Sequence, residues 1–268
     1  MSSKDSTSKT LIVAFCLCVV CSIVVSGTAV ILKPRQDANR VLDRNKNILN
    51  AAGMFDPEVN TNEDVEQIFS QFTPRIVDLK SGRFLSEGEL DELQIDIENY
   101  DQRLVINDSN FSEAISREQD IANVKRRVIY PMVYVMGNGD GGDGFETIVV
   151  PINGYGLWGI LYGFIALERD VNTVKGLAFY ELKETPGLGA EVRNPNWARL
   201  WPGKRVYDDS GDVALRVVKG AGSGEYQIDG LSGATLTSRG VDNLIQYWLG
   251  EDGYGPLLAD VRDSGGED

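Results

Sequence analysis

The feature that most constrains this chain is an uncharged apolar run near its N-terminus. Residues 11–32, "LIVAFCLCVVCSIVVSGTAVIL", contain no Asp, Glu, Lys or Arg. At about 1.5 Å per residue, a helix over this run is about 33 Å long, enough to cross the hydrocarbon layer of a membrane. A cleaved signal peptide has a shorter apolar run and a small-residue cleavage site. Here the bulky "AVILKP" stands where cleavage would fall, so we expect a retained transmembrane helix.

The charges that flank this run favour one orientation of the helix. Lys4 and Lys9 precede it, and Lys33, Arg35 and Arg40 follow it closely. Basic residues tend to stay on the cytoplasmic side of a membrane. The charge count alone therefore favours a cytoplasmic C-terminal part.

Composition excludes several classes of function. The net charge of -14 argues against nucleic-acid binding, which requires clustered Lys and Arg. The chain has no histidine, and its three cysteines (Cys16, Cys18 and Cys21) all lie in the apolar run, where we interpret them as packing residues. The rest of the chain therefore offers neither a disulfide nor a Cys-ligated metal centre, and it lacks the most common general base.

The first part of the chain after the apolar run reads as helical. Residues 36–53 resemble a polar helix that leaves the membrane and ends at Gly53. Residues 61–72, "TNEDVEQIFSQF", place apolar side chains at helical spacing, which predicts an amphipathic helix. Residues 80–126 are rich in charge and show no clear period.

Beyond residue 128 the period becomes that of strands. The runs "VIYPMVYVM", "FETIVVPI", "LWGILYGFIALE" and "VKGLAFYEL" predict one largely antiparallel sheet, and "VALRVVKG" (213–220) predicts a further strand. We interpret "GNGDGGDG" (137–144) as a hairpin tip, because it lacks the terminal Glu of a calcium-binding EF-hand loop. A final amphipathic helix follows Thr237 and ends at Gly250. The expected fold class is α+β, with one N-terminal transmembrane helix and a soluble domain in which helices flank the sheet.

Two motifs resemble those of known enzymes but lack the required context. "GYGLWG" (154–159) has the spacing of a dinucleotide-binding loop, but the residues after it read as a strand instead of a helix. It is better interpreted as a glycine-rich bend whose Tyr155 and Trp158 could line a planar ligand. "GLSGA" (230–234) is close to a hydrolase nucleophile elbow, but a chain without histidine cannot form the usual triad.

A cluster of small and hydroxylated residues, "DGLSGATLTS" (229–238), precedes the last helix. The N–H groups and positive dipole end at a helix start form a natural anion site. Simple N-capping by one Thr or Ser hydroxyl explains the same residues. The residues alone leave both interpretations open.

The same stretch resembles the covalent flavinylation motif of the FMN-binding domain family. The chain as a whole is similar to the NqrC family, whose members are the C subunits of sodium-translocating NADH:quinone reductases. The similarity extends over the N-terminal span, "GYGLWG", "ETPGLGAEVRNPNW" (184–197), "DGLSGATLTS" and "YWLGEDGYGPLLADVRD". It implies that a flavin transferase esterifies FMN to Thr235, with Thr237 as the second candidate. It also implies cofactor contacts from Ser232, Gly233, Ala234, Glu184, Thr185, Gly187, Leu188 and Gly189, to which we add Tyr155 and Trp158.

The resemblance implies a role in electron transport. Relatives carry electrons between redox centres of partner subunits in a sodium-pumping complex of the bacterial inner membrane. Their soluble domain lies in the periplasm, whereas the charge count above favours the cytoplasm. The partners implied are membrane and soluble subunits of the reductase, the flavin transferase and membrane lipid, with no nucleic acid and no metal bound by this chain. Two alternatives stay open: an FMN-bearing subunit of a related electron-transport complex, and a non-redox anchored domain for assembly or binding.

These expectations divide the chain into four parts. They are a short tail (1–10), a transmembrane helix (11–32), a helical and mixed connecting region (33–126) and an FMN-binding domain (127–268). No residue of this chain is expected to be catalytic on its own, because the bound flavin carries the redox chemistry.

Overall fold

A computed structural model describes residues 7–137 and 145–264. The helices are α1 (Thr7–Ala51), α2 (Asn62–Phe69), α3 (Glu87–Glu92), α4 (Pro195–Ala198), α5 (Thr235–Leu249) and α6 (Gly255–Ser264), with short 3₁₀ turns η1 (Val105–Asn107) and η2 (Gly189–Arg193). The strands are β1 (Phe72–Asp78), β2 (Arg83–Phe84), β3 (Ser112–Ala114), β4 (Arg126–Val128), β5 (Met132–Gly137), β6 (Phe145–Tyr155), β7 (Ile160–Glu168), β8 (Val174–Glu181), β9 (Arg216–Val218) and β10 (Gln227–Asp229).

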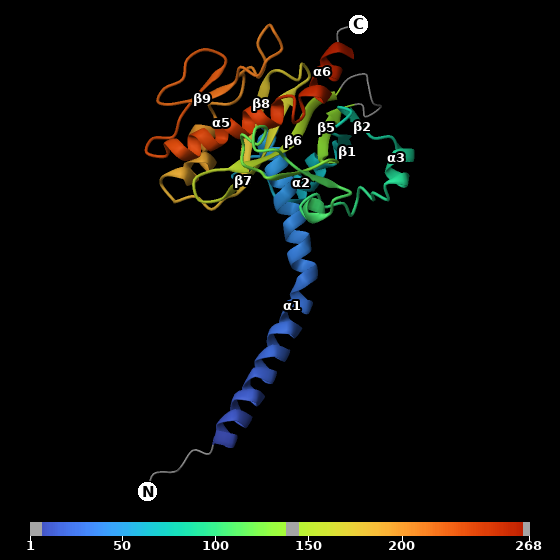
Figure 1. Ribbon diagram of the computed structural model, residues 1–268, viewed down its shortest axis with the longest axis vertical. Helices are drawn as coiled ribbons and strands as arrows, with labels where there is room; N and C mark the ends of the chain where they lie inside the picture. Colours follow the sequence, from blue (N-terminus) through green and yellow to red (C-terminus); the bar gives the residue numbers. More distant parts are fainter. Residues whose placement is uncertain (1–6, 138–144, 265–268) are drawn as a thin grey trace. The chain divides into compact units, whose positions relative to one another are not determined.

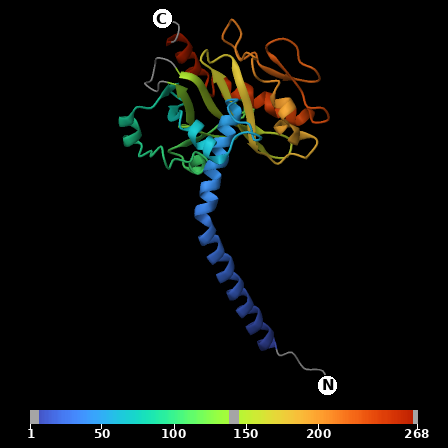
Figure 2. The same cartoon turned by 180° about the vertical axis from the view of Figure 1, so that it is seen from behind.

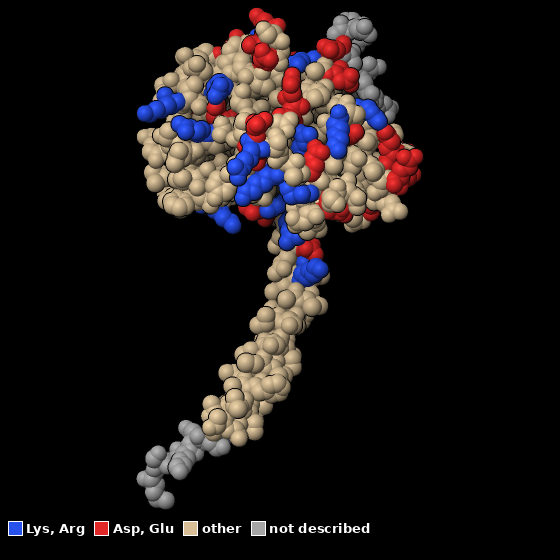
Figure 3. Space-filling model, in the orientation of Figure 1, with Lys and Arg blue, Asp and Glu red and all other residues tan. Residues whose placement is uncertain are grey.

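Helix α1 contains the predicted transmembrane segment. It is the one helix among the described residues that is long and apolar enough to cross a membrane. Residues 11–32 carry no acidic or basic side chain, and their large apolar side chains are exposed (Figure 3). The polar helix expected over 36–53 is not a separate element, because α1 continues through Pro34 to Ala51. A proline removes one backbone donor and usually kinks a helix, but here it does not end the helix.

The chain divides into two compact units, residues 1–44 and residues 45–268. In the second unit, Ile48, Leu49 and Ala51 at the end of α1 are fully buried. Gly176 of β8 lies so close to this end that a Cβ there would come within 2.4 Å of the Ala51 carbonyl oxygen. The last turns of α1 are therefore part of the folded domain, and the boundary proposed at 126/127 stays a prediction.

The described residues form a main sheet of six strands in the order β2-β1-β5-β6-β7-β8. All neighbouring strands are antiparallel, as the sequence predicts. Helix α5 covers one face of this sheet, and the end of α1 with α2 lies over the other (Figures 1 and 2). Side chains are buried on both faces of the sheet. In β6, Ile148, Val150 and Ile152 point into the main core, and the alternate residue Val149 is buried on the opposite face.

Three predicted elements are present with different bounds. The amphipathic helix ends at Phe69, because Phe72 already pairs with Met136 as the first residue of β1. The apolar run that begins at Val128 is divided between β4 and β5, with Pro131 between them, and proline cannot donate to a sheet ladder. The strand predicted over 213–220 is shorter and pairs in parallel with β10, outside the main sheet.

The proposed hairpin tip at 137–144 falls almost entirely outside the described residues, which resume at 145. The strands on either side of it, β5 and β6, pair antiparallel. The last helix agrees with the prediction at its C-terminal end, since α5 stops at Leu249 before Gly250.

Candidate functional site

The "GYGLWG" motif forms the tight connection between β6 and β7. The two strands pair up to Tyr155 and Ile160, and the Gly156 N–H donates to the Gly159 carbonyl over 2.8 Å. The motif is therefore a strand-turn-strand bend, as the sequence indicates, and not the strand-to-helix turn of a dinucleotide site. Leu157 and Trp158 at the tip of this hairpin turn (156–159) are exposed.

The glycines of this motif allow the hairpin to approach α5 closely. A Cβ on Gly154 would lie 2.7 Å from Cβ of Leu244 on α5. From the other side, a Cβ on Gly240 of α5 would lie 2.4 Å from the Tyr155 carbonyl oxygen. Both distances are shorter than real Cβ contacts, so glycine is required for this packing.

The "ETPGLG" loop (184–189) follows β8 and leads into η2. The Thr185 carbonyl accepts hydrogen bonds from the N–H groups of Leu188 and Ala190, both at 3.1 Å, which closes the loop into a turn. Gly187 has a φ of 75°, a left-handed conformation that favours glycine. Thr185, Gly187 and Leu188 are exposed, whereas Glu184 and Gly189 are buried.

Helix α5 begins in the middle of the hydroxyl cluster. Its N-cap residue is Ala234, which has no side-chain cap, so the interpretation of the cluster as simple N-capping is wrong. Thr235 is the first residue of the helix and is exposed. Within the described residues, its hydroxyl has no hydrogen bond and the N–H groups of Thr235, Leu236 and Thr237 have no acceptor. Free N–H groups at the positive end of a helix favour an anion.

Two other hydroxyls of the cluster, those of Thr237 and Ser238, have internal partners. Thr237 is 1% exposed, and its Oγ1 donates to Oε2 of Glu184 over 2.7 Å. Ser238 Oγ accepts from the Leu231 N–H at 2.9 Å and donates to the Ala234 carbonyl at 3.1 Å. These bonds fold the loop back onto the first turn of the helix. Gly233 supplies a left-handed residue within this loop, with a φ of 75°.

Glu184 connects the three segments. Its Oε1 accepts hydrogen bonds from the N–H groups of Leu157 (2.9 Å) and Trp158 (3.0 Å), and its Oε2 accepts from Thr237. Its side chain is 7% exposed. One carboxylate therefore joins the hairpin turn, the "ETPGLG" loop and the start of α5, which lie far apart in the sequence.

The predicted residues gather at one place, although their side chains differ in exposure. Leu188 lies next to Gly233, since a Cβ added to Gly233 would lie 3.1 Å from Cδ2 of Leu188. Tyr155 and Trp158 are 38% and 63% exposed, and Ser232 is exposed while Ala234 is buried. Sequence reasoning missed Leu157 and Leu236, which are exposed apolar residues at 39% and 52%. Exposure of single apolar residues leaves no sequence signal, because it depends on which tertiary contacts form.

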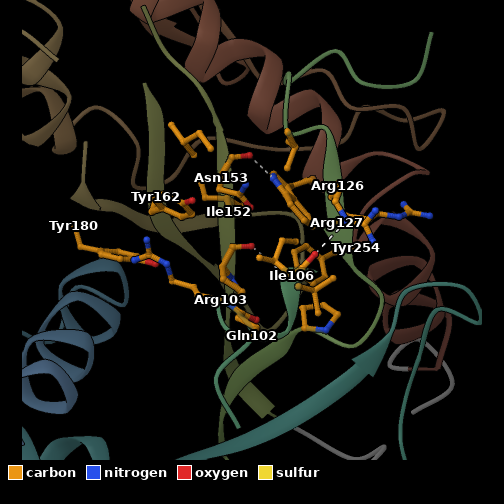
Figure 4. A pocket seen from close by; sticks show the side chains of 16 residues that line it. Gln102, Arg103, Ile106, Arg126, Arg127, Ile152, Asn153, Tyr162, Tyr180 and Tyr254 are labelled. Carbon is orange, nitrogen blue, oxygen red and sulfur yellow. Dashed lines mark hydrogen bonds between the residues drawn. The ribbon is translucent and has the colours of Figure 1, made fainter. Parts of the chain in front are cut away.

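A separate hollow of about 200 Å³ contains none of the predicted residues (Figure 4). Its guanidinium groups already have partners: Arg103 pairs with Glu181 and lies 4.2 Å from the centre of the Tyr162 ring, and Arg127 pairs with Glu113. The hydrogen bond from Arg103 lowers the pKa of Glu181. Burial raises the pKa of Tyr180 to about 12. The hollow is lined by Gln102, Arg103, Ile106, Val124, Arg126, Arg127, Val128, Pro131, Pro151, Ile152, Asn153, Ile160, Tyr162, Tyr180, Trp248 and Tyr254.

Comparison with known proteins shows which family the domain belongs to. Residues 156–250 match the FMN-binding domain family, a span that contains the hairpin turn, the loop and α5. The chain is 45% identical to the C subunit of the Na(+)-translocating NADH-quinone reductase of Pseudomonas aeruginosa, over 98% of each chain. It is 44% identical to the same protein from Yersinia pestis, over 97% of this chain and 95% of that one.

A solved structure shares the fold. The crystal structure of Shewanella oneidensis NqrC superposes with a TM-score of 0.72 at 31% identity, over 82% of this chain and 97% of that chain. Fold and site together define an FMN-binding domain protein with an N-terminal apolar helix. More closely, the chain belongs to the NqrC family, the C subunits of Na(+)-translocating NADH-quinone reductases.

Proposed function

We propose that this protein carries FMN through a phosphoester on Thr235 and relays electrons between redox centres of partner subunits. The observation that supports Thr235 most strongly is the contrast between the two threonines. The Thr235 hydroxyl is exposed and has no hydrogen bond within the described residues, whereas Thr237 is buried and bonded to Glu184. A flavin transferase can reach an exposed hydroxyl without unfolding the helix.

The surroundings of Thr235 suit a phosphate. The linkage, which has lost one water relative to threonine and FMN, keeps one negative charge on the phosphodiester. That charge would lie beside the free N–H groups of the first turn of α5, where the helix dipole favours it. Gly233 keeps the loop before the helix free of a side chain, so the backbone can approach the phosphate closely.

Exposed apolar side chains lie on the segments around Thr235. They are Tyr155, Leu157, Trp158, Leu188 and Leu236. Their side chains offer apolar and aromatic surface to the planar ring system of FMN. When bound, FMN supplies reversible electron transfer, and the residues of the chain hold and orient it. The acceptor threonine is thus the site of modification and not a catalytic residue.

The same proposal gives the chain its place in the cell. Helix α1 anchors it in the bacterial inner membrane as a single-pass subunit beside membrane and soluble partners, with the folded domain in the periplasm. The apolar part of α1 has no charged residue that could form an ion path, so sodium passage belongs to partner subunits. The charge count around the helix favours the opposite orientation, but its excess of basic residues is small and partner subunits can fix topology.

Co-expression with a flavin transferase tests the attachment. After denaturation and precipitation, the wild-type pellet should keep the visible absorbance of flavin, and the Thr235→Ala pellet should lose it. Thr237→Val removes the buried hydroxyl at constant side-chain volume and should keep the absorbance. A colourless wild-type pellet would favour the non-redox assembly or binding domain. A coloured Thr235→Ala pellet would move the attachment to another residue.

A further inference from the structure

The side chain of Glu184 faces inward from the proposed flavin site. Its two oxygens accept three hydrogen bonds, from the N–H groups of Leu157 and Trp158 and from the hydroxyl of Thr237. None of the ion pairs among the described residues includes it. A buried carboxylate is costly unless hydrogen bonds satisfy it. Here all three donors come from the hairpin turn and the first turn of α5.

The backbone is shaped to fit this carboxylate. A Cβ on Gly156 of the hairpin turn would lie 2.5 Å from Oε1. A Cβ on Gly189 would lie 2.3 Å from Oε2 and 2.5 Å from Oγ1 of Thr237. Two glycines, two backbone donors and one hydroxyl thus surround a single side chain. A larger residue at either glycine position would displace the carboxylate.

We propose that Glu184 is a positioning residue of the flavin site and not a direct contact of the flavin. This inference rests on the proposed attachment at Thr235. The carboxylate holds the hairpin turn, with its exposed Leu157 and Trp158, against the first turn of α5. It thereby fixes the distance between the apolar surface that would receive the flavin ring and the threonine that carries the phosphate.

The charge of Glu184 has a second consequence for the bound flavin. Charges interact more strongly in a buried environment than in water. A buried negative charge beneath the site makes the addition of electrons to the flavin less favourable, so it lowers the reduction potential of the flavin. A glutamine at this position keeps an acceptor oxygen for both N–H groups and an amide that can donate to Thr237, but it removes the charge.

The test uses the full chain, co-expressed with the flavin transferase and purified in detergent. Three variants are compared with wild type: Glu184→Gln, Glu184→Ala and the control Glu181→Ala. Glu181 lies three positions earlier, but its exposed carboxylate pairs with Arg103 outside the site. For each protein, intact mass gives the covalent FMN content, visible circular dichroism reports the flavin environment, and a redox titration gives the reduction potential.

We expect Glu184→Ala to change the visible circular dichroism of the covalently bound flavin. Glu184→Gln should keep the wild-type spectrum and shift the potential to a more positive value. The expected size is a tenfold change in the ratio of reduced to oxidised flavin at a fixed ambient potential, about 30 mV for a two-electron couple. Glu181→Ala should match wild type in both properties.

Two results would overturn the inference. One is a flavin-loaded Glu184→Ala protein with the wild-type spectrum and potential. The other is a Glu184→Gln protein whose potential equals that of wild type, which overturns the effect assigned to the charge of Glu184 even if Glu184→Ala does not fold. A wild-type chain that carries no FMN by mass would instead remove the proposed attachment, so the two failures are distinguished.

Discussion

Hydroxyl groups at neighbouring positions have different tasks in this protein. Within four residues, Thr235 is exposed, Thr237 is bonded to Glu184, and Ser238 closes the loop before α5. The sequence predicts the cluster and its place at a helix start. It does not predict which hydroxyl is exposed, because this depends on Ala234 being the N-cap and on where Glu184 lies. The resemblance to a family points to Thr235, and the geometry supplies a physical reason for that choice.

Ser238→Ala should destabilise the domain without removing the flavin acceptor. Its Oγ is the acceptor for the Leu231 N–H and a donor to the Ala234 carbonyl. Losing it leaves a partly buried N–H without a partner, which costs about 1–3 kcal/mol. Urea unfolding measures the change in the free energy of unfolding. The exposed Ser232 provides the control, and an equal loss for Ser232→Ala would contradict the role given to Ser238.

At the level of elements, the site depends on how closely α5 packs on the β6–β7 hairpin. Periodicity predicts α5 and four of the main-sheet strands, β5 to β8, but not β1 or β2, and turn residues predict the bend at 154–159. Strand order and the parallel β9–β10 pair are set by contacts between distant segments, for which periodicity has no signal. The close approach of Gly240 to Tyr155 is likewise a property of the assembled fold.

Gly240→Ala should separate the two elements or strain them. Its Cβ would lie 2.4 Å from the Tyr155 carbonyl oxygen and 3.0 Å from Cα of Gly156, both backbone atoms. Overpacking of this kind costs about 1–3 kcal/mol, despite the higher helix propensity of alanine. Thermal unfolding measures the loss. Gly88→Ala in α3 adds a Cβ with no atom within 4 Å, and its stability should be unchanged or slightly higher. A Gly240→Ala protein as stable as wild type would contradict the packing argument.

For the molecule as a whole, the sequence predicts an anchor and a folded domain but gives conflicting signals about topology. The apolar run and the family agree on a membrane helix, and α1 contains it. Flanking charges favour a cytoplasmic domain, whereas the proposed function places the domain in the periplasm. Net charge does not settle the orientation, because only basic residues close to the span matter. Labelling of an introduced cysteine distinguishes the two orientations.

A single introduced cysteine reports which side of the membrane the domain lies on, since the chain has no cysteine beyond residue 21. Ser109 is exposed, and Ser109→Cys should react with a membrane-impermeant maleimide in intact cells with a permeabilised outer membrane. The parent chain, whose cysteines all lie in the apolar run, is the background control. Labelling only after the inner membrane is broken would place the domain in the cytoplasm.

The central claim is that Thr235 carries the flavin, and mass spectrometry tests it most directly. The chain is co-expressed with a flavin transferase, its intact mass is measured, and the modified peptide is sequenced by fragmentation. The account predicts one added FMN minus water, located on Thr235. An unmodified chain, or a flavin located on Thr237, would contradict it.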